Sequence, residues 1–265
     1  AAGVRPSEID MVVVATSTPD DIYPATAGKV QAALGIAPGP FFDVQAVCAG
    51  FTYALYLANQ TIMLGDARNI LVIGADINSR ILDEKDRSTF VLFGDGAGAM
   101  VLGAEKGGDD NAPGILIAKI DGDGRERDKL FVEGGAPGGI INSSGTLSRG
   151  KVRMQGKEVF RFAVEKMSLI VEQCLAKKEL TIADIDWYIP HQANKRIMIA
   201  VCERLKMDPA KIVSTVHEHA NISAATIPLA MAMANDEKKF KTGQLLAISA
   251  LGGGFAWGGA LLRWG

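Results

Sequence analysis

The sequence predicts an α/β protein built from two similar halves. Three observations carry this prediction: apolar, β-branched runs alternate with segments of helical spacing, almost half of the 265 residues are hydrophobic, and the order of elements in the first half returns in the second. Such alternation is typical of a largely parallel sheet covered by helices. We expect an N-terminal half over residues 1–150 and a C-terminal half over residues 151–265.

Apolar runs mark the expected strands, and apolar residues at helical spacing mark the expected helices. In the first half we expect strands at 11–16, 41–47, 69–77 and 96–104, and helices at 24–34 and 50–64. In the second half we expect helices at 157–178, 194–205 and 223–234, and strands at 186–191, 211–215, 244–251 and 255–264. Residues 105–150 are rich in Gly, Asp, Asn and Ser and are interpreted as a loop-rich connection with one strand at 114–120.

Three pairs of similar segments indicate an internal duplication. EIDMVVVAT is similar to DIDWYIPH, NILVIGADI to QLLAISALG, and GDGAGAMVLG to GGFAWGGALL, in the same order. The first two segments lie roughly 60 residues apart in both halves, as a duplication would give. The second half opens with a long helix before its first strand, whereas the first half starts almost at its strand. We therefore expect the first copy to be truncated at its start.

Composition excludes several classes of protein. The net charge of −2 gives no electrostatic reason to expect a nucleic acid as partner. No apolar run reaches the roughly 18 residues of a membrane helix, and the N-terminus lacks the basic start and apolar stretch of a signal peptide. Three scattered cysteines make neither a disulfide framework nor a zinc site. We expect a cytoplasmic protein with no metal and no membrane partner.

Cys48 lies at the junction between an expected strand and an expected helix. The N–H groups and the dipole at a helix N-terminus favour a thiolate, so we expect a lowered pKa and a nucleophilic thiol. Ala49 and Gly50 are small enough to let a substrate approach. A buried core cysteine fits the same position equally well. Cys174 and Cys202 lie within expected helices and are interpreted as core residues.

His191 and Asn221 are polar residues at the ends of expected elements. His191 ends a strand, which is where open α/β sheets place their ligands, although a structural polar residue also fits. Asn221 precedes a helix, where it could cap the helix or aim its amide N–H₂ at a carbonyl oxygen. His217 and His219 flank the loop before Asn221 and are given at most a minor role.

Two glycine-rich stretches have different interpretations. The run Gly252, Gly253 and Gly254 could present a backbone N–H to a developing oxyanion, or form a bulge. The GDGAG segment at 94–98 lacks the glycine spacing and the helix of a dinucleotide site and is interpreted as close packing.

A basic cluster follows His191 and is either a solvated helix face or a docking patch for an acidic partner: Lys195, Arg196, Arg204, Lys206 and Lys211.

Together these residues closely resemble the beta-ketoacyl-acyl-carrier-protein synthase III family of the thiolase-like superfamily. The matching segments are FDVQAVCAGFTYAL, FGDGAGAMVL, DWYIPHQANKRI, HANISAAT and LGGGFAWGGALL, and the resemblance runs over essentially the whole chain. It implies a thiolase-like fold with duplicated βαβαβαββ halves in α-β-α-β-α layers. It also implies a Cys-His-Asn triad of Cys48, His191 and Asn221, and an oxyanion hole from the backbone N–H groups of Cys48 and Gly253.

The same resemblance implies further contacts. Residues matching the family's coenzyme A and pantetheine tunnel are Arg87, Met154, Gly156, Phe160, Ala193 and Asn194. Carrier-protein docking falls on Lys195 and Arg196, and Tyr23 matches an aromatic residue that reaches into the acyl pocket of the partner subunit. The implied enzyme is a homodimeric acyltransferase of fatty acid biosynthesis. It condenses a short acyl-CoA, acetyl-CoA being expected, with malonyl-acyl-carrier protein, and coenzyme A thioester is its substrate rather than a cofactor.

Four departures from the family pattern stand out. Roughly 60 N-terminal residues expected of the family are absent from this sequence, in line with the shortened first repeat. Ala220 stands where glycine is usual, Ile222 where threonine is usual, and Leu251 where phenylalanine is common. The last three are expected to reshape the acyl pocket.

Three other interpretations stay open at this point. One is a related condensing enzyme that uses another acyl primer in secondary metabolism. Another is a Cys-His-Asn hydrolase, since papain-like proteases use the same residue types. A truncated copy that only dimerises is the third, which the intact triad argues against.

Overall fold

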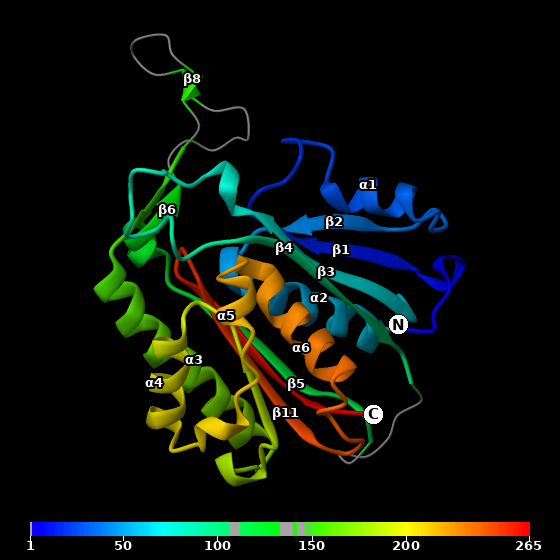
Figure 1. Cartoon of the computed structure of the whole chain (residues 1–265). Helices are drawn as coiled ribbons and strands as arrows, with labels where there is room; N and C mark the ends of the chain where they lie inside the picture. Colours follow the sequence, from blue (N-terminus) through cyan, green and yellow to red (C-terminus); the bar gives the residue numbers. More distant parts are fainter. Residues whose placement is uncertain (1, 106–111, 133–139, 142–146, 149) are drawn as a thin grey trace.

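The structure is a computed structural model that describes residues 2–105, 112–132, 140–141, 147–148 and 150–265. Its framework is a pair of four-stranded sheets, seen in Figure 1 as a blue to cyan sheet and a green to red sheet. The predicted loop-rich connection at 105–150 lies partly outside the described residues. No helix in the described part of the chain is long and apolar enough to cross a bilayer.

The first sheet has the strand order β2-β1-β3-β4. These strands are β1 (Met11–Ala15), β2 (Phe41–Val44), β3 (Asn69–Ile77) and β4 (Asp95–Gly103). β1 pairs in parallel with both β2 and β3, and β4 runs antiparallel to β3. All five residues of β1 are buried, which agrees with its continuous apolar run.

The second sheet repeats this pattern in the order β10-β11-β12-β5. It contains β10 (Trp187–Pro190), β11 (Leu245–Gly252), β12 (Ala256–Arg263) and β5 (Gly114–Gly122). β10 is parallel to β11, and β12 is antiparallel to β11, as β1, β3 and β4 are in the first sheet. The predicted duplication is thereby confirmed. β5 pairs with β12 although it precedes residue 150, so the chain crosses to the second sheet between β4 and β5, and the division at residue 150 stays a proposal.

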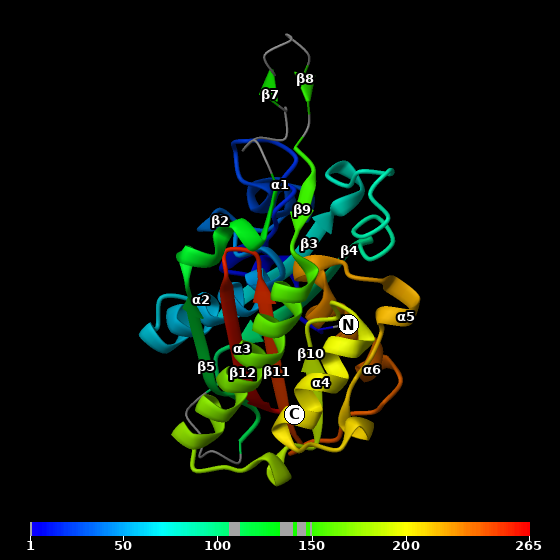
Figure 2. The ribbon, with the colours of Figure 1, turned by 90° about the vertical axis from the view of Figure 1, so that its left-hand side faces the viewer.

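Helices form the other three layers. α1 (Thr26–Ala33) packs on the first sheet, and α3 (Gly156–Lys177) and α4 (Lys195–Leu205) cover the second. α2 (Gly50–Leu64) and α6 (Thr226–Asp236) contact strands of both sheets and lie between them, as Figure 1 shows. Figure 2 shows α3 and α4 in front of the second sheet. The largest buried cluster occupies this central layer. The α-β-α-β-α architecture is the one that the resemblance implies.

Shorter elements complete the description. They are α5 (Val216–His219) and the paired short strands β6 (Leu130–Val132) with β9 (Val152–Met154) and β7 (Ile140–Ile141) with β8 (Leu147–Ser148). Single 3-10 turns that matter below are η2 (Val47–Ala49), η6 (Pro209–Lys211) and η7 (Ser223–Ala225).

The prediction of a strand at 211–215 is wrong. Only an isolated bridge joins Ile212 to Tyr188 of β10. The side-chain amide of Gln192 donates to the Val213 carbonyl at 3.2 Å and accepts from Thr215 N–H at 3.0 Å. A side chain therefore satisfies the backbone groups that a strand partner would otherwise bond.

Candidate active site

Cys48 occupies η2, between the end of β2 and the first residue of α2. Its side chain is buried, with 4% of its surface exposed. Gly252, at the end of β11, lies against this turn, and a Cβ atom on Gly252 would come within 2.9 Å of Cys48 N. Glycine is therefore needed at position 252, where two backbones approach closely at the nucleophile.

The predicted lowering of the Cys48 pKa is not what the structure shows. Burial raises the pKa of the Cys48 thiol to about 12, and the nearby Asp76 charge raises it further. Hydrogen bonds with the side chains of Ser223 and Asn221 lower the pKa but do not offset the burial. The resting group is a neutral thiol, and α2 contributes only the favourable orientation of its N-terminal amides.

His191 follows β10 and extends its pairing, because its N–H donates to the Ser249 carbonyl at 2.8 Å. The ring is buried, and its Nδ1 lies 2.7 Å from Thr226 Oγ1. Burial lowers the pKa of His191 to about 3, so the ring is neutral at physiological pH. A neutral ring has one N–H, and the Thr226 contact decides which nitrogen carries it.

Asn221 is held at the loop before β4. Its N–H donates to the Leu92 carbonyl at 2.9 Å, and its carbonyl accepts from Gly94 N–H at 3.0 Å. Its Oδ1 accepts from Ser223 N–H, two residues further on, at 2.9 Å. Ile222 is the N-cap of η7 and α6 begins at Thr226, so the predicted capping of a helix by Asn221 is wrong. Because Ser223 N–H must face an oxygen, the amide N–H₂ is turned toward the Cys48 thiol, to which Asn221 hydrogen-bonds.

A single cavity of 690 Å³ brings Cys48, His191 and Asn221 together, although they come from both halves of the chain. Five residues predicted to contact coenzyme A and both predicted docking residues also line it: Met154, Gly156, Phe160, Ala193, Asn194, Lys195 and Arg196. Arg87 is not among the lining residues, but its neighbour Ser88 is. Gly253 and Tyr23 do not line the cavity of this chain either, and Tyr23 is 83% exposed.

Gly96 packs against Ile222 and Gly98 against the Leu229 backbone, so close packing explains the GDGAG segment. Cys174 and Cys202 are buried core residues, as predicted. His217 and His219 are exposed and lie outside the cavity lining.

Of the three substituted positions that depart from the family pattern, one lines the cavity and two do not. Leu251 lines the cavity, as expected of a residue that shapes the acyl pocket. Ile222 and Ala220 are absent from the lining residues, and Ile222 is buried against Gly96. Sequence reasoning missed Asp76 and Thr226, whose side chains contact the turns that carry the triad. Their only sequence signal is a polar residue within an otherwise apolar segment.

Two matched α/β halves that direct a cysteine, a histidine and an asparagine into one cavity define a condensing enzyme of the thiolase-like class. Comparisons with known proteins give the family. Residues 42–124 match the family model described as 3-oxoacyl-[acyl-carrier-protein] synthase III, and residues 175–264 match the model of its C-terminal part. The chain belongs to the beta-ketoacyl-[acyl-carrier-protein] synthase III family and is an acyltransferase.

Individual relatives support the same family assignment. The chain is 51% identical over 263 residues to the beta-ketoacyl-[acyl-carrier-protein] synthase III of Rhodospirillum centenum, spanning 99% of this chain and 79% of the relative. It is 48% identical to the same enzyme of Agrobacterium fabrum, of which it spans 80%. The crystal structure of the Aquifex aeolicus enzyme superimposes with a TM-score of 0.89 at 38% identity, over 99% of this chain and 80% of that one.

Proposed function

We propose that this chain condenses a short acyl-CoA, with acetyl-CoA as the expected primer, with malonyl-acyl-carrier protein, and so initiates fatty acid synthesis. The observation that carries the proposal is the meeting of Cys48, His191 and Asn221 at one cavity. Each of the three residue types has a defined task in a decarboxylative condensation. Family membership supports this activity over the hydrolase interpretation.

The first half-reaction transfers the acyl group. Cys48 sulfur attacks the thioester carbonyl, the carbon–sulfur bond to coenzyme A breaks, and the cysteine proton leaves with the coenzyme A thiol. The proposed oxyanion donors are the backbone N–H groups of Cys48 and Gly253. The close approach of the adjacent Gly252 to Cys48 N supports this placement.

In the second half-reaction the malonyl group loses carbon dioxide and leaves an enolate. Asn221 and His191 are proposed to donate hydrogen bonds to its oxygen. The enolate carbon then attacks the carbonyl carbon of acyl-Cys48, and the carbon–sulfur bond to Cys48 breaks to give a 3-ketoacyl-carrier protein. The released Cys48 thiolate takes a proton from water and returns to the thiol. For neutral His191 to donate into the cavity, its proton must lie on Nε2. Its Nδ1 must then accept from the Thr226 hydroxyl, 2.7 Å away.

The cavity lining supports binding of a pantetheine arm. Phe160, Met154 and Ala193 supply apolar surface, and Asn194 and Gly156 lie beside them. Arg87 keeps its proposed role as a coenzyme A contact outside the cavity.

Lys195 and Arg196, at the start of α4, are proposed to bind an acidic carrier protein. The Arg196 guanidinium lies 6.0 Å from the centre of the Phe160 ring. The guanidinium thus lies over the cavity wall, and because Arg196 is exposed its charge is available to a partner.

A homodimer is proposed from the exposed apolar side chains near Tyr23. Ile22 is 69% exposed and Phe41, on the edge strand β2, is 42% exposed. In such a dimer Tyr23 would reach the acyl pocket of the partner.

The three cysteines are free thiols, which supports a reducing, cytoplasmic location.

The decisive experiment is the intact mass of the protein after incubation with acetyl-CoA, beside Cys48→Ser. A gain of one acetyl group that the variant lacks supports the proposal. Acylation only by longer or branched acyl-CoAs would favour a related enzyme with another primer. That alternative draws on a 31% identical structure, a priming β-ketosynthase of the R1128 polyketide pathway, with a TM-score of 0.89. Stable dimers with no acylation would favour a non-catalytic copy.

A further inference from the structure

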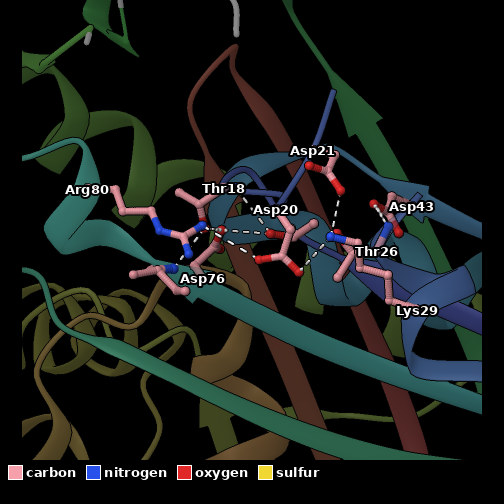
Figure 3. Close-up of polar contacts among 10 residues, drawn as sticks. Thr18, Asp20, Asp21, Thr26, Lys29, Asp43, Asp76 and Arg80 are labelled. Atoms are coloured by element: carbon pink, nitrogen blue, oxygen red, sulfur yellow. Dashed lines mark hydrogen bonds and ion pairs between the residues drawn. The ribbon is translucent and has the colours of Figure 1, made fainter. Parts of the chain in front are cut away.

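Asp76, on β3, is a buried carboxylate at the meeting point of two loops. Its Oδ1 accepts from Ser17 N–H at 2.7 Å, Thr18 Oγ1 at 3.1 Å and Thr16 Oγ1 at 3.3 Å. Its Oδ2 accepts from Ala224 N–H at 3.2 Å. Only 2% of the Asp76 surface is exposed. Figure 3 shows Asp76 beside Thr18.

These contacts are those of an acceptor. Thr18 Oγ1 accepts from Ile77 N–H at 2.7 Å, and Thr16 Oγ1 accepts from Thr18 N–H at 3.1 Å, so both hydroxyl protons are free for Asp76. Burial raises the pKa of Asp76 above its usual value, and the hydrogen bonds from the surrounding donors offset only part of that rise. Donors of this number are what a buried carboxylate needs in place of water.

The bond to Ala224 attaches the catalytic turn to the first sheet. Gly74 lies two residues before Asp76 on β3, and a Cβ atom there would overlap the Ala224 carbonyl. η7 therefore rests directly on β3, and Asp76 is the β3 side chain that bonds its backbone. Asn221, just before η7, contacts Cys48, and Thr226, just after η7, contacts His191.

We propose that Asp76 is a positioning residue for the decarboxylation step, because its carboxylate fixes Ala224 and thereby sets Asn221 and Thr226 beside Cys48 and His191. The inference rests on the proposed function. Acylation needs only the thiol and the oxyanion donors. Decarboxylation also needs the side chains of Asn221 and His191 to be placed so that both can donate to the same oxygen. A shift of η7 should therefore separate the two half-reactions.

Asp76→Asn tests this directly. Three donors hold the side-chain oxygen at the Oδ1 position, so the new N–H₂ faces Ala224 N–H and repels the turn. Displacement of about 1 Å costs on the order of 100-fold in rate, so we expect decarboxylation of malonyl-carrier protein to fall about 10- to 100-fold. Acylation of Cys48 should stay unchanged or become faster, because the Asp76 charge raises the pKa of the thiol.

Asp43→Asn is the matched control. Asp43, on β2, also accepts two backbone N–H groups, from Thr26 at 2.7 Å and Ala27 at 2.9 Å, but has no bond to η7. Figure 3 shows it beside Thr26, away from Asp76. We expect it to lower thermal stability while leaving both half-reactions of the folded protein within about twofold of wild type.

The half-reactions are followed separately, acylation by intact mass and decarboxylation by release of carbon dioxide. Equal loss of both in Asp76→Asn, or loss of neither, would overturn the proposal. If Asp76→Asn does not fold, Thr16→Val with Thr18→Val keeps the charge but removes two donors. It should slow decarboxylation about 3- to 10-fold with acylation within about twofold, and an equal loss there would overturn it too. Wild-type protein inactive in both assays would instead refute the proposed function.

Discussion

The Nδ1 atom of His191 lies 2.7 Å from the hydroxyl oxygen of Thr226, and both side chains are buried. This contact joins the end of β10 to the first residue of α6. The same hydroxyl lies 3.0 Å from the Ser223 carbonyl, so its single proton has two possible acceptors. When the proton of the neutral His191 ring lies on Nε2, the hydroxyl proton of Thr226 must point to Nδ1 of His191.

Thr226→Val should therefore slow decarboxylation and spare acylation. The valine keeps the shape but leaves Nδ1 without a partner, which costs about 1–3 kcal/mol and corresponds to roughly a 5- to 150-fold loss. Carbon dioxide release from malonyl-carrier protein measures the effect. Thr226→Ser, which keeps the hydroxyl, should stay within about threefold of wild type. A Thr226→Val enzyme as fast as wild type would show that the hydroxyl does not set the ring.

Burial of His191 makes stability depend on pH. The native ring, with its pKa lowered to about 3, stays neutral where the unfolded chain takes up a proton below about 6.5. The unfolded state then binds more protons, so the free energy of unfolding falls as pH falls. Between pH 7 and pH 5 this one group should account for about 2 kcal/mol of lost stability.

Urea unfolding of His191→Asn at pH 7, 6 and 5 checks this value. The variant should lose about 2 kcal/mol less than wild type over that range. Identical pH profiles for His191→Asn and wild type would mean that His191 is not neutral in the native state.

Much of the fold follows from local sequence. The apolar run of β1 and the glycine at the end of α2 predict these elements closely, because each signal lies within the element itself. The strand expected at 211–215 fails because Gln192, far away in sequence, bonds its backbone. Long-range contacts of this kind leave no local pattern.

The site likewise has features that the sequence predicts and features that depend on long-range contacts. Cys48, His191 and Asn221 occupy ends of elements that the sequence predicts, and the family resemblance selects them. The raised pKa of Cys48 comes from burial by both halves of the chain, which a junction between strand and helix does not reveal. Asp76 lies in a strand segment, NILVIGADI, where an aspartate gives no sign of a partner such as Ala224.

Leu251 should limit the length of the acyl group. It lines the cavity one residue before the glycine run that touches Cys48. Leu251→Phe should lower kcat/KM for a six-carbon acyl-CoA at least about 10-fold, and for acetyl-CoA less than about threefold, because the larger ring fills acyl space. Leu251→Met conserves volume and should change neither much. Equal losses for both primers would place Leu251 outside the acyl pocket.

Ala220 adopts a backbone conformation that favours glycine. Its φ of 57° and ψ of −160° fall in a region where a Cβ atom is strained, and glycine is usual there in the family. Ala220→Gly should raise the free energy of unfolding by about 1 kcal/mol, since relief of about 1–3 kcal/mol of strain exceeds the added freedom of the unfolded chain. Ala176→Gly, at an exposed position in the last turn of α3, should lower it by less than the roughly 0.5–1 kcal/mol of a helix interior. Urea unfolding of both variants gives the comparison. Loss of stability in both would mean that Ala220 fits its backbone without strain, and that this departure from the family carries no energetic cost.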